Sequence, residues 1–217
     1  SQTHKWVRSL VECNGLLGTY GFSYQGLTQL VSEEGCNPPD CMAPAMTGLS
    51  ELEHWSCEGG AFWWHLGIGW GLQLAAQKAL REKKLNIWKE IRANLESNQY
   101  LTNGHKLLEK YDPKGMAFKW LKLSNEKQKH WVSHQPLESW LKKPMLLIGG
   151  WWDPHLKGIL DIFEKSINAG GSPQLLIGPA THLQWWEGIH STQLKFFDKY
   201  LKETVNKHFS PHINLWN

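Results

Sequence analysis

Continuous apolar runs alternate with segments of helical spacing in the first and last parts of the chain. An apolar run without alternation predicts a strand that is buried on both faces, which is typical of a parallel sheet covered by helices. The predicted strands are residues 15–22, 41–45, 144–150 and 173–179. The helices expected between and after them are residues 24–32, 156–168 and 188–203. The pattern therefore predicts an α/β domain with a parallel sheet.

The middle of the chain, from Met46 to about Gln135, shows no strand signal. Its apolar residues recur at helical spacing, in segments separated by Asn and Asp-Pro breaks. The expected helices are residues 61–80, 83–96, 105–110 and 113–121. We therefore expect a helical insertion over residues 46–135, which interrupts a sheet built from residues 1–45 and 136–208.

One turn between a predicted strand and a predicted helix carries a serine with glycines on both sides. Residues 16–26 read Leu-Leu-Gly-Thr-Tyr-Gly-Phe-Ser-Tyr-Gln-Gly, so Ser23 stands at the corner. In a nucleophile elbow, G-x-S-x-G, this corner exposes the serine hydroxyl above the sheet. Gln25, however, occupies the place of the last glycine, and a turn serine that only caps the next helix fits the same residues. Ser23 alone does not decide between the two interpretations.

Two later strands each end at a residue suited to acid–base chemistry. Asp153 follows the predicted strand 144–150, and His182 follows the predicted strand 173–179. The carboxyl ends of parallel strands meet at one edge of the sheet, so we expect Ser23, Asp153 and His182 at the same rim. A serine becomes nucleophilic when an imidazole takes its proton and a carboxylate orients that imidazole. The chain order Ser, Asp, His is that of the α/β-hydrolase triad, which we predict here.

The acid and the base each have a structural alternative. Asp153 followed by Pro154 is also a common helix start, because Asp favours the N-cap and Pro the first helical position. His182 is one of 11 histidines. His155 and His190 lie in predicted helical segments, where they are less well placed to act as the base.

Composition and charge narrow the range of partners. Hydrophobic residues make up 41% and charged residues 20% of the 217 positions, which is typical of folded domains. The net charge of +3 comes with scattered lysines and does not indicate nucleic-acid binding. No apolar run approaches the roughly 18 residues of a membrane span. The first four residues, Ser-Gln-Thr-His, show no signal-peptide pattern, so we expect a cytoplasmic protein. They include no initiator Met, so the sequence begins as though cut from something longer.

Three cysteines and one histidine superficially resemble a zinc ligand set. Cys36, Cys41, His54 and Cys57 are spaced C-x4-C-x12-H-x2-C. Cys41 opens a predicted strand, however, and the spacing matches no common zinc module, so buried free thiols fit better. We expect no metal ion and no cofactor.

Several motifs in combination resemble the CocE/NonD hydrolases, the family of X-Pro dipeptidyl-peptidases and cocaine esterases. Residues 21–26, Gly-Phe-Ser-Tyr-Gln-Gly, are similar to the family's G-x-S-Y-x-G elbow, which also moves the last glycine one place along. Residues 149–153, Gly-Gly-Trp-Trp-Asp, resemble its G-G-W-Y-D segment, and residues 178–182, Gly-Pro-Ala-Thr-His, its G-P-W-T-H segment. Residues 58–62 are similar to the start of its helical cap, and residues 196–202 to the helix that closes its catalytic domain.

The resemblance implies an α/β-hydrolase-type parallel sheet with an inserted all-helical cap. It implies Ser23 as nucleophile, Asp153 as acid and His182 as base, with the backbone N–H of Tyr24 in the oxyanion hole. Family members also have strands before the elbow, which carry a second oxyanion donor, and a jelly-roll domain after the closing helix. The sequence therefore resembles part of such a protein that lacks those strands and that domain, with residues 209–217 at the start of the latter. With only one oxyanion donor assigned, residues 1–217 alone are expected to turn over substrate poorly. Ala180 departs from the family's usual Trp, which opens the pocket or has little effect.

The implied substrates are small esters, acyl amino-acid derivatives or X-Pro dipeptides, and the oligomeric state stays open. No acidic cluster is evident for a substrate amine, which favours an ester. Among the 14 tryptophans, Trp151 and Trp152 are expected, together with Phe62, to line the substrate pocket, although most tryptophans fit packing better. Two rival interpretations are a non-catalytic ligand-binding module on a truncated hydrolase scaffold and a zinc-stabilised structural domain.

Overall fold

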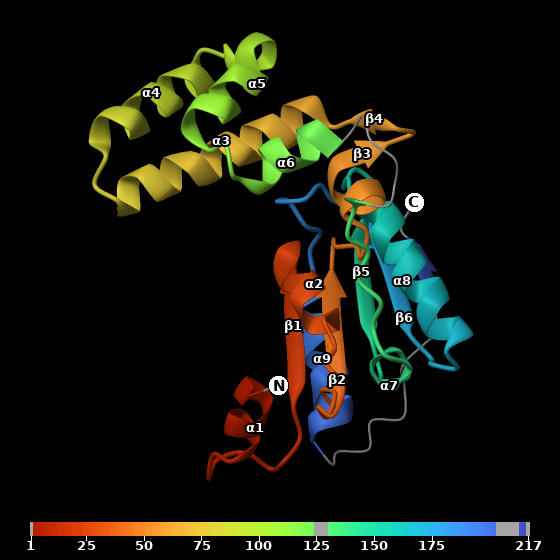
Figure 1. Ribbon diagram of the computed structural model, residues 1–217. Coiled ribbons are helices and arrows are strands. Elements are labelled where there is room, and N and C mark those ends of the chain that lie inside the picture. Colours follow the sequence, from red (N-terminus) through yellow and green to blue (C-terminus); the bar gives the residue numbers. More distant parts are fainter. Residues whose placement is uncertain (1, 124–129, 203–212, 216–217) are drawn as a thin grey trace. The chain divides into compact units, whose positions relative to one another are not determined.

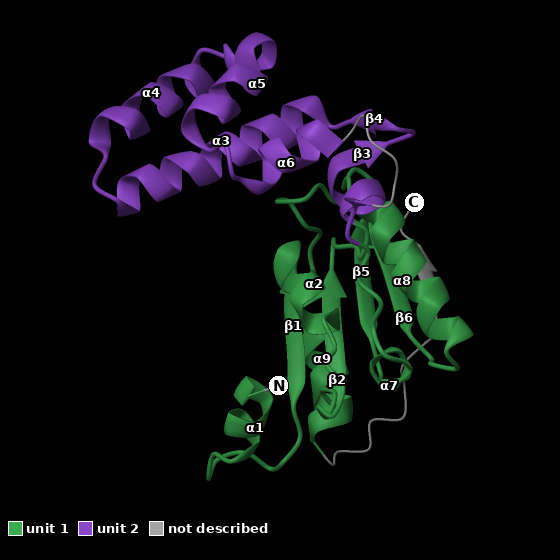
Figure 2. Cartoon of the chain, in the orientation of Figure 1, with its two compact units in different colours: residues 1–50, 133–217 green, residues 51–132 purple. Residues whose placement is uncertain are grey.

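The structure, a computed structural model, describes residues 2–123, 130–202 and 213–215. The chain divides into two compact units (Figure 2). Unit 1 comprises residues 1–50 and 133–217, and unit 2 comprises residues 51–132. No helix in the described ranges is both long and apolar enough to cross a membrane.

Unit 1 is built on a parallel five-stranded sheet, as the apolar runs predict (Figure 1). The strand order is β1-β2-β5-β6-β7. The strands are β1 (Gly18–Phe22), β2 (Cys41–Ala45), β5 (Leu146–Gly150), β6 (Gln174–Gly178) and β7 (Ile213–Leu215). Phe22 pairs with Ala45, and Gly150 pairs with Gly178, so β1 ends level with β2 and β5 ends level with β6. Ala45 pairs with Ile148, so β5 runs two residues beyond the end of β2. Whatever follows each strand is therefore brought to one edge of the sheet.

Helices cover both faces of this sheet. The helices of unit 1 are α1 (Gln2–Arg8), α2 (Tyr24–Leu30), α7 (Glu138–Leu141), α8 (Leu156–Asn168) and α9 (Ile189–Leu201). Met145 and Leu147 belong to a core shared with α2, α7 and α8, whereas Leu146 and Ile148 belong to a core shared with α9. Alternate residues of one strand are thus buried on opposite faces, which explains why the strand reads as a continuous apolar run.

Unit 2 is helical except for a short hairpin. Its helices are α3 (Trp64–Arg81), α4 (Leu85–Glu96), α5 (Tyr100–Tyr111) and α6 (Met116–Leu123). A π-helical turn, η1 (Glu51–Ser56), precedes the hairpin of β3 (Cys57–Glu58) and β4 (Ala61–Phe62). Glycines let the helices approach closely: a Cβ on Gly71 would lie 2.4 Å from Ala117, and one on Gly104 would lie 2.4 Å from Ile68. The helix expected over residues 61–80 is α3, which begins three residues later than predicted because residues 61–62 form β4.

The end of the chain combines described and undescribed residues. The expected helix 188–203 corresponds to α9, and residue 203 lies outside the described residues. Within residues 209–217, assigned from the sequence to the start of a further domain, the structure describes only Ile213–Leu215. These three residues pair with β6 as strand β7.

Candidate active site

Ser23 stands at a strained corner between β1 and α2. Its backbone has φ 59° and ψ −134°, a conformation that non-glycine residues rarely adopt and that is typical of functional sites. Its N–H donates to the carbonyl oxygens of Ala45 (3.0 Å) and Met46 (3.2 Å), at the end of β2. Its own carbonyl accepts a hydrogen bond from the N–H of Gly26 (2.9 Å). These backbone bonds hold the half-buried serine at the carboxyl edge of the sheet.

Two glycines make room for this corner. Gly21 has φ +150°, and a Cβ there would lie 2.7 Å from the Cβ of Gln25. A Cβ on Gly26 would lie 2.8 Å from the Cγ2 of Thr47 and 3.0 Å from the carbonyl oxygen of Ala45. Gln25 is exposed. The close approach therefore falls at position 26, which explains why Gln25 can replace the glycine of the G-x-S-x-G pattern.

Asp153 lies just beyond β5, with its side chain fully buried. Its Oδ2 accepts a hydrogen bond from Nδ1 of His182 at 2.5 Å. Its Oδ1 accepts a hydrogen bond from the backbone N–H of His155 at 2.8 Å. Both carboxylate oxygens thus have a donor, which offsets the cost of burying the charge.

Backbone contacts join the segments that follow β5 and β6. The N–H of Trp151 donates to the carbonyl oxygen of Gly178 (3.0 Å), and that of Trp152 donates to the carbonyl oxygen of Ala180 (3.1 Å). A Cβ on Gly150 would lie only 2.4 Å from the carbonyl oxygen of Ala180. The absence of a side chain at Gly150 therefore allows the approach that brings Asp153 to His182.

His182 is surrounded by aromatic rings as well as by the carboxylate. Its ring centroid lies 5.4 Å from that of Phe22, the residue before Ser23, and 5.1 Å from that of His155. The indole N–H of Trp185 donates to the carbonyl oxygen of His182 (3.3 Å). Because Nδ1 is engaged by Asp153, Nε2 is the nitrogen left to exchange a proton.

The contact between Phe22 and His182 links the elbow to the histidine. Among the described residues, no hydrogen bond joins the Ser23 hydroxyl to His182. Hydrogen bonds between a nucleophile and its base are often long or poorly aligned without substrate. The structure therefore brings Asp153 and His182 into direct contact, and brings the elbow to His182 through the ring of Phe22.

Several of the predicted substrate-contacting side chains are exposed at this edge. Trp152 is 67% exposed and Trp151 43%. The side chain of Tyr24, whose backbone N–H is the predicted oxyanion donor, is 56% exposed. Ala180, in contrast, is buried, so its methyl group faces packed protein and opens no space. Phe62 belongs to unit 2, where its ring packs beside Gly67 of α3.

Sequence reasoning did not single out Phe22 and treated His155 as a helical residue. His155 is buried and forms the N-cap position of α8. The order Asp-Pro-His marks a helix start but carries no signal for a ring contact with His182. That contact depends on how the segments after β5 and β6 meet.

Two cysteines of the superficial zinc pattern lie in different environments. Cys41 is fully buried in β2, and burial, with the nearby Asp40, raises the pKa of its thiol to about 12. The Cys36 thiol donates to the Glu33 carboxylate at 3.4 Å.

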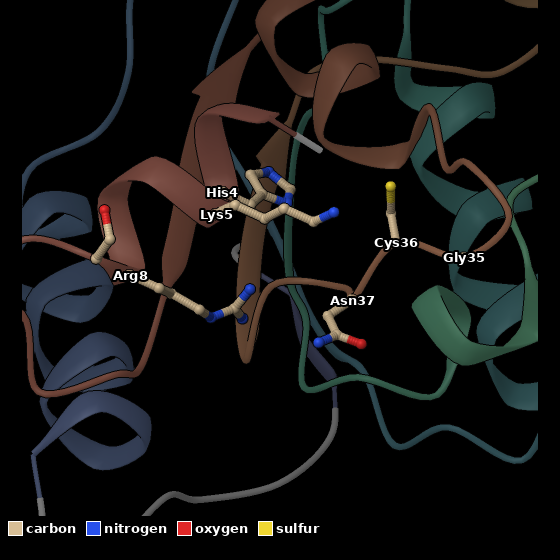
Figure 3. A pocket seen from close by; sticks show the side chains of 7 residues that line it. His4, Lys5, Arg8, Gly35, Cys36 and Asn37 are labelled. Atoms are coloured by element: carbon tan, nitrogen blue, oxygen red, sulfur yellow. The ribbon is translucent and has the colours of Figure 1, made fainter.

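A cavity of about 290 Å³ lies elsewhere in unit 1 (Figure 3). It is lined by His4, Lys5, Arg8, Ser9, Gly35, Cys36 and Asn37. These residues come from α1 and from the loop that leads into the amino end of β2. Ser23, Asp153 and His182 follow the carboxyl ends of strands, so this cavity is not part of the candidate site.

Comparisons with known proteins agree with the fold. The chain is similar to the crystal structure of a CocE/NonD family hydrolase from Staphylococcus aureus, with a TM-score of 0.64 at 18% sequence identity. The match covers 99% of this chain and 34% of that one, so the chain spans about a third of that protein's length. A second match is to a structure assigned as a dipeptidyl aminopeptidase IV from Bacteroides ovatus. It has a TM-score of 0.45 at 13% identity and covers 92% of this chain and 22% of that one.

Curated protein sequences give no match. The X-Pro dipeptidyl-peptidase (S15) family, in contrast, matches residues 1–184, most of the chain's 217 residues. That match spans the strained serine corner, the buried aspartate and the histidine bound to it. The chain belongs to the X-Pro dipeptidyl-peptidase (S15) family.

Proposed function

We propose that this chain carries the catalytic machinery of a serine hydrolase, which cleaves a small ester or amide through an acyl-enzyme. The observation that carries the proposal is the hydrogen bond between His182 Nδ1 and the buried Asp153, at the edge where Ser23 occupies a strained strand-to-helix corner. A buried carboxylate on Nδ1 fixes the imidazole tautomer in which Nε2 accepts a proton. Family membership and the fold support the same reaction class.

The first step forms a bond between Ser23 Oγ and the substrate's carbonyl carbon. The serine proton passes to Nε2 of His182, and the carbonyl electron pair moves onto the oxygen. Asp153 stabilises the imidazolium that results. When the tetrahedral intermediate collapses, the bond to the leaving alcohol or amine breaks, and Nε2 returns the proton to that group. Water then repeats the sequence on the acyl-serine and releases the acid.

The backbone N–H of Tyr24 is the oxyanion donor in this proposal. It follows the nucleophile directly, which is the position that supplies one donor in a nucleophile elbow. A preorganised N–H at the developing oxyanion lowers the barrier because it needs no rearrangement during the reaction.

The substrate class follows from the exposed aromatic side chains. Trp151, Trp152 and Tyr24 offer flat apolar surface near the segments that carry Asp153 and Ser23. Such surface favours a hydrophobic or aromatic acyl group. We favour an ester over an X-Pro dipeptide, because the sequence offers no evident acidic cluster for a free amine.

A fluorophosphonate probe tests the proposal directly, since it reacts quickly only with a base-activated serine. We expect the 217-residue chain to be labelled at Ser23 slowly, because the Tyr24 N–H is the one oxyanion donor assigned in it, and the Ser23→Ala variant to remain unlabelled. Ser97→Ala, which alters an exposed serine on unit 2, is the matched control and should label like the parent. Labelling that survives Ser23→Ala would remove the nucleophile assignment.

Substrate class is tested with three compounds: an aryl ester of an aromatic acid, an X-Pro arylamide with a free amine, and the same arylamide with its amine acetylated. We expect the ester to be cleaved fastest and acetylation to change the amide rate little. Strong dependence on the free amine would instead assign a dipeptidyl-peptidase. Saturable binding of the aromatic acid without any labelling of Ser23 would favour the non-catalytic binding module.

A further inference from the structure

His155 lies where it contacts both predicted partners of the nucleophile. Its backbone N–H donates to Oδ1 of Asp153 at 2.8 Å, while its ring centroid lies 5.1 Å from that of His182. The two rings are tilted by 59°. The residue is 4% exposed, so its imidazole does not reach an incoming substrate from solvent. It therefore touches the acid and the base without standing among the reacting atoms.

The position of His155 is fixed by the start of α8. The N–H of Ile159 donates to the carbonyl oxygen of His155 (3.1 Å), which begins the helix. One residue earlier in that turn, Gly158 packs directly against the backbone after β2. A Cβ on Gly158 would lie 2.4 Å from the carbonyl oxygen of Thr47 and 2.6 Å from the Cα of Gly48. The first turn of α8 is thus held against the sheet, and the ring of His155 is held with it.

His182, in contrast, lies on an irregular segment after β6. Its side chain is 27% exposed, and the hydrogen bond to Asp153 restrains only one edge of the ring. A single hydrogen bond leaves the imidazole free to rock about it. The remaining restraint comes from rings, namely Phe22 at 5.4 Å from β1 and His155 at 5.1 Å from the start of α8.

We propose that His155 is a positioning residue, which uses its backbone N–H to hold the Asp153 carboxylate and its ring to hold the imidazole of His182 in line with Ser23. The inference rests on the proposed function for its effect on rate. Its physical content, the order of the Asp153–His182 pair, can be measured without any turnover. A shift of about 1 Å in a reacting group can cost a hundredfold in rate, so a modest loss of restraint is detectable.

Substitutions at position 155 separate the two contributions, because every residue except proline keeps the backbone N–H. His155→Ala and His155→Leu remove the planar ring, and leucine keeps a buried apolar side chain so that the fold is retained. His155→Phe keeps an aromatic ring and removes both ring nitrogens. We expect Ala and Leu to lower the rate of fluorophosphonate labelling by roughly tenfold, as the loss of one aromatic contact suggests. Phe should restore most of that loss.

The second readout is the downfield proton resonance of the hydrogen bond between His182 and Asp153. We expect it to broaden or disappear in His155→Leu and to persist in His155→Phe. His190→Ala is the matched control, since His190 is exposed on α9 and its Nδ1 lies 3.4 Å from Gln193. That variant should change neither the labelling rate nor the resonance.

The outcomes separate this inference from the proposed function. The positioning role would be overturned if His155→Leu and His155→Ala were labelled at the parent rate and kept the His182–Asp153 proton resonance unchanged. It would also be overturned if His155→Phe lost as much of the labelling rate as His155→Leu. The ring nitrogens of His155, and not its aromatic ring, would then be the important feature. If the parent chain fails to label at all, the proposed function fails, while the resonance still decides whether His155 orders the pair.

Discussion

Oδ2 of Asp153 lies 2.5 Å from Nδ1 of His182, although 28 residues separate the two along the chain. Asp153 follows β5 and His182 follows β6, and these strands are neighbours that end in register at Gly150 and Gly178. The contact is therefore a direct result of the parallel sheet. It makes the acid and the base the first positions at which the proposed mechanism can be tested.

Replacing Asp153 with Asn should leave the fold intact and lower kcat by about 10⁴. The Asn side-chain oxygen can still accept the His155 N–H, but its NH₂ group cannot accept the proton of His182 Nδ1. The imidazole would then favour the wrong tautomer. Ester hydrolysis and a thermal melt measure the two effects, with Asp198→Asn on the exposed face of α9 as control. A loss below tenfold at an unchanged melting temperature would mean that another carboxylate orients the base.

Replacing His182 with Ala should lower fluorophosphonate labelling of Ser23 by about a thousandfold or more, because no other group then takes the serine proton. His190→Ala should label at the parent rate. Mass spectrometry of the labelled peptide measures both rates. Retained labelling in His182→Ala would show that a different residue is the base.

Replacing Gly21 with Ala should distort the serine corner. The new Cβ would lie 2.7 Å from the Cβ of Gln25, at a backbone φ of +150°. Overpacking of this kind costs about 1–3 kcal/mol of unfolding free energy, and we expect labelling of the folded protein to fall more than tenfold. Gly35→Ala is the matched control, with φ +74° but no atom within 4 Å of the new Cβ. Gly35→Ala should be somewhat less stable than the parent but should be labelled at the parent rate. Equal losses of labelling rate in Gly21→Ala and Gly35→Ala would contradict the prediction.

The carboxylate of Asp40 should contribute stability that depends on pH. Burial raises its pKa, but hydrogen bonds from the Arg8 side chain (2.9 Å) and the Leu17 N–H (2.8 Å), with the nearby positive charges, hold it below its ordinary value. A folded-state pKa below the unfolded value of about 3.9 stabilises the fold above that pH. The contribution is lost as the pH falls through the folded-state pKa.

Urea unfolding of the parent and of Asp40→Asn tests this dependence. We expect the parent to be more stable at pH 7 and the difference to shrink progressively below about pH 4. Glu138→Gln, which removes an exposed ion pair with Lys142, should have little effect at either pH. A difference between Asp40→Asn and the parent that stays constant from pH 7 to pH 3 would contradict the assignment.

The cysteines should differ sharply in reactivity. A thiol pKa of about 12 leaves Cys41 with about one thiolate in ten thousand at pH 8, and burial blocks access as well. Cys13 and Cys36 are partly exposed. Alkylation of the folded protein, followed by peptide mass spectrometry, should therefore modify Cys13 and Cys36 first and Cys41 only in denaturant. If Cys41 were alkylated rapidly and added zinc prevented this, the result would instead support a zinc site that includes Cys41.

The sequence by itself predicted the parallel sheet and the edge of that sheet at which the candidate site residues lie. Continuous apolar runs report burial on both faces, as in β5, and the strand Cys41–Ala45 and the helix Leu156–Asn168 have the bounds that the pattern indicates. The hairpin Cys57–Phe62 escaped detection, because strands of two residues show no periodicity. Local pattern therefore predicted which residues follow strands, and with them Ser23, Asp153 and His182 as candidates.

Only the tertiary structure decided how the segments after those strands meet. The glycine at position 26 is explained by Thr47 on the adjoining strand end, and the glycine at position 150 by the carbonyl of Ala180. The same is true of His155, which in the sequence is a helix-start residue and in the fold lies against His182. Hydrophobic spacing records the conformation and burial of one segment at a time. Close approach between segments distant in sequence leaves no trace in that spacing, because it depends on the packing of the whole sheet.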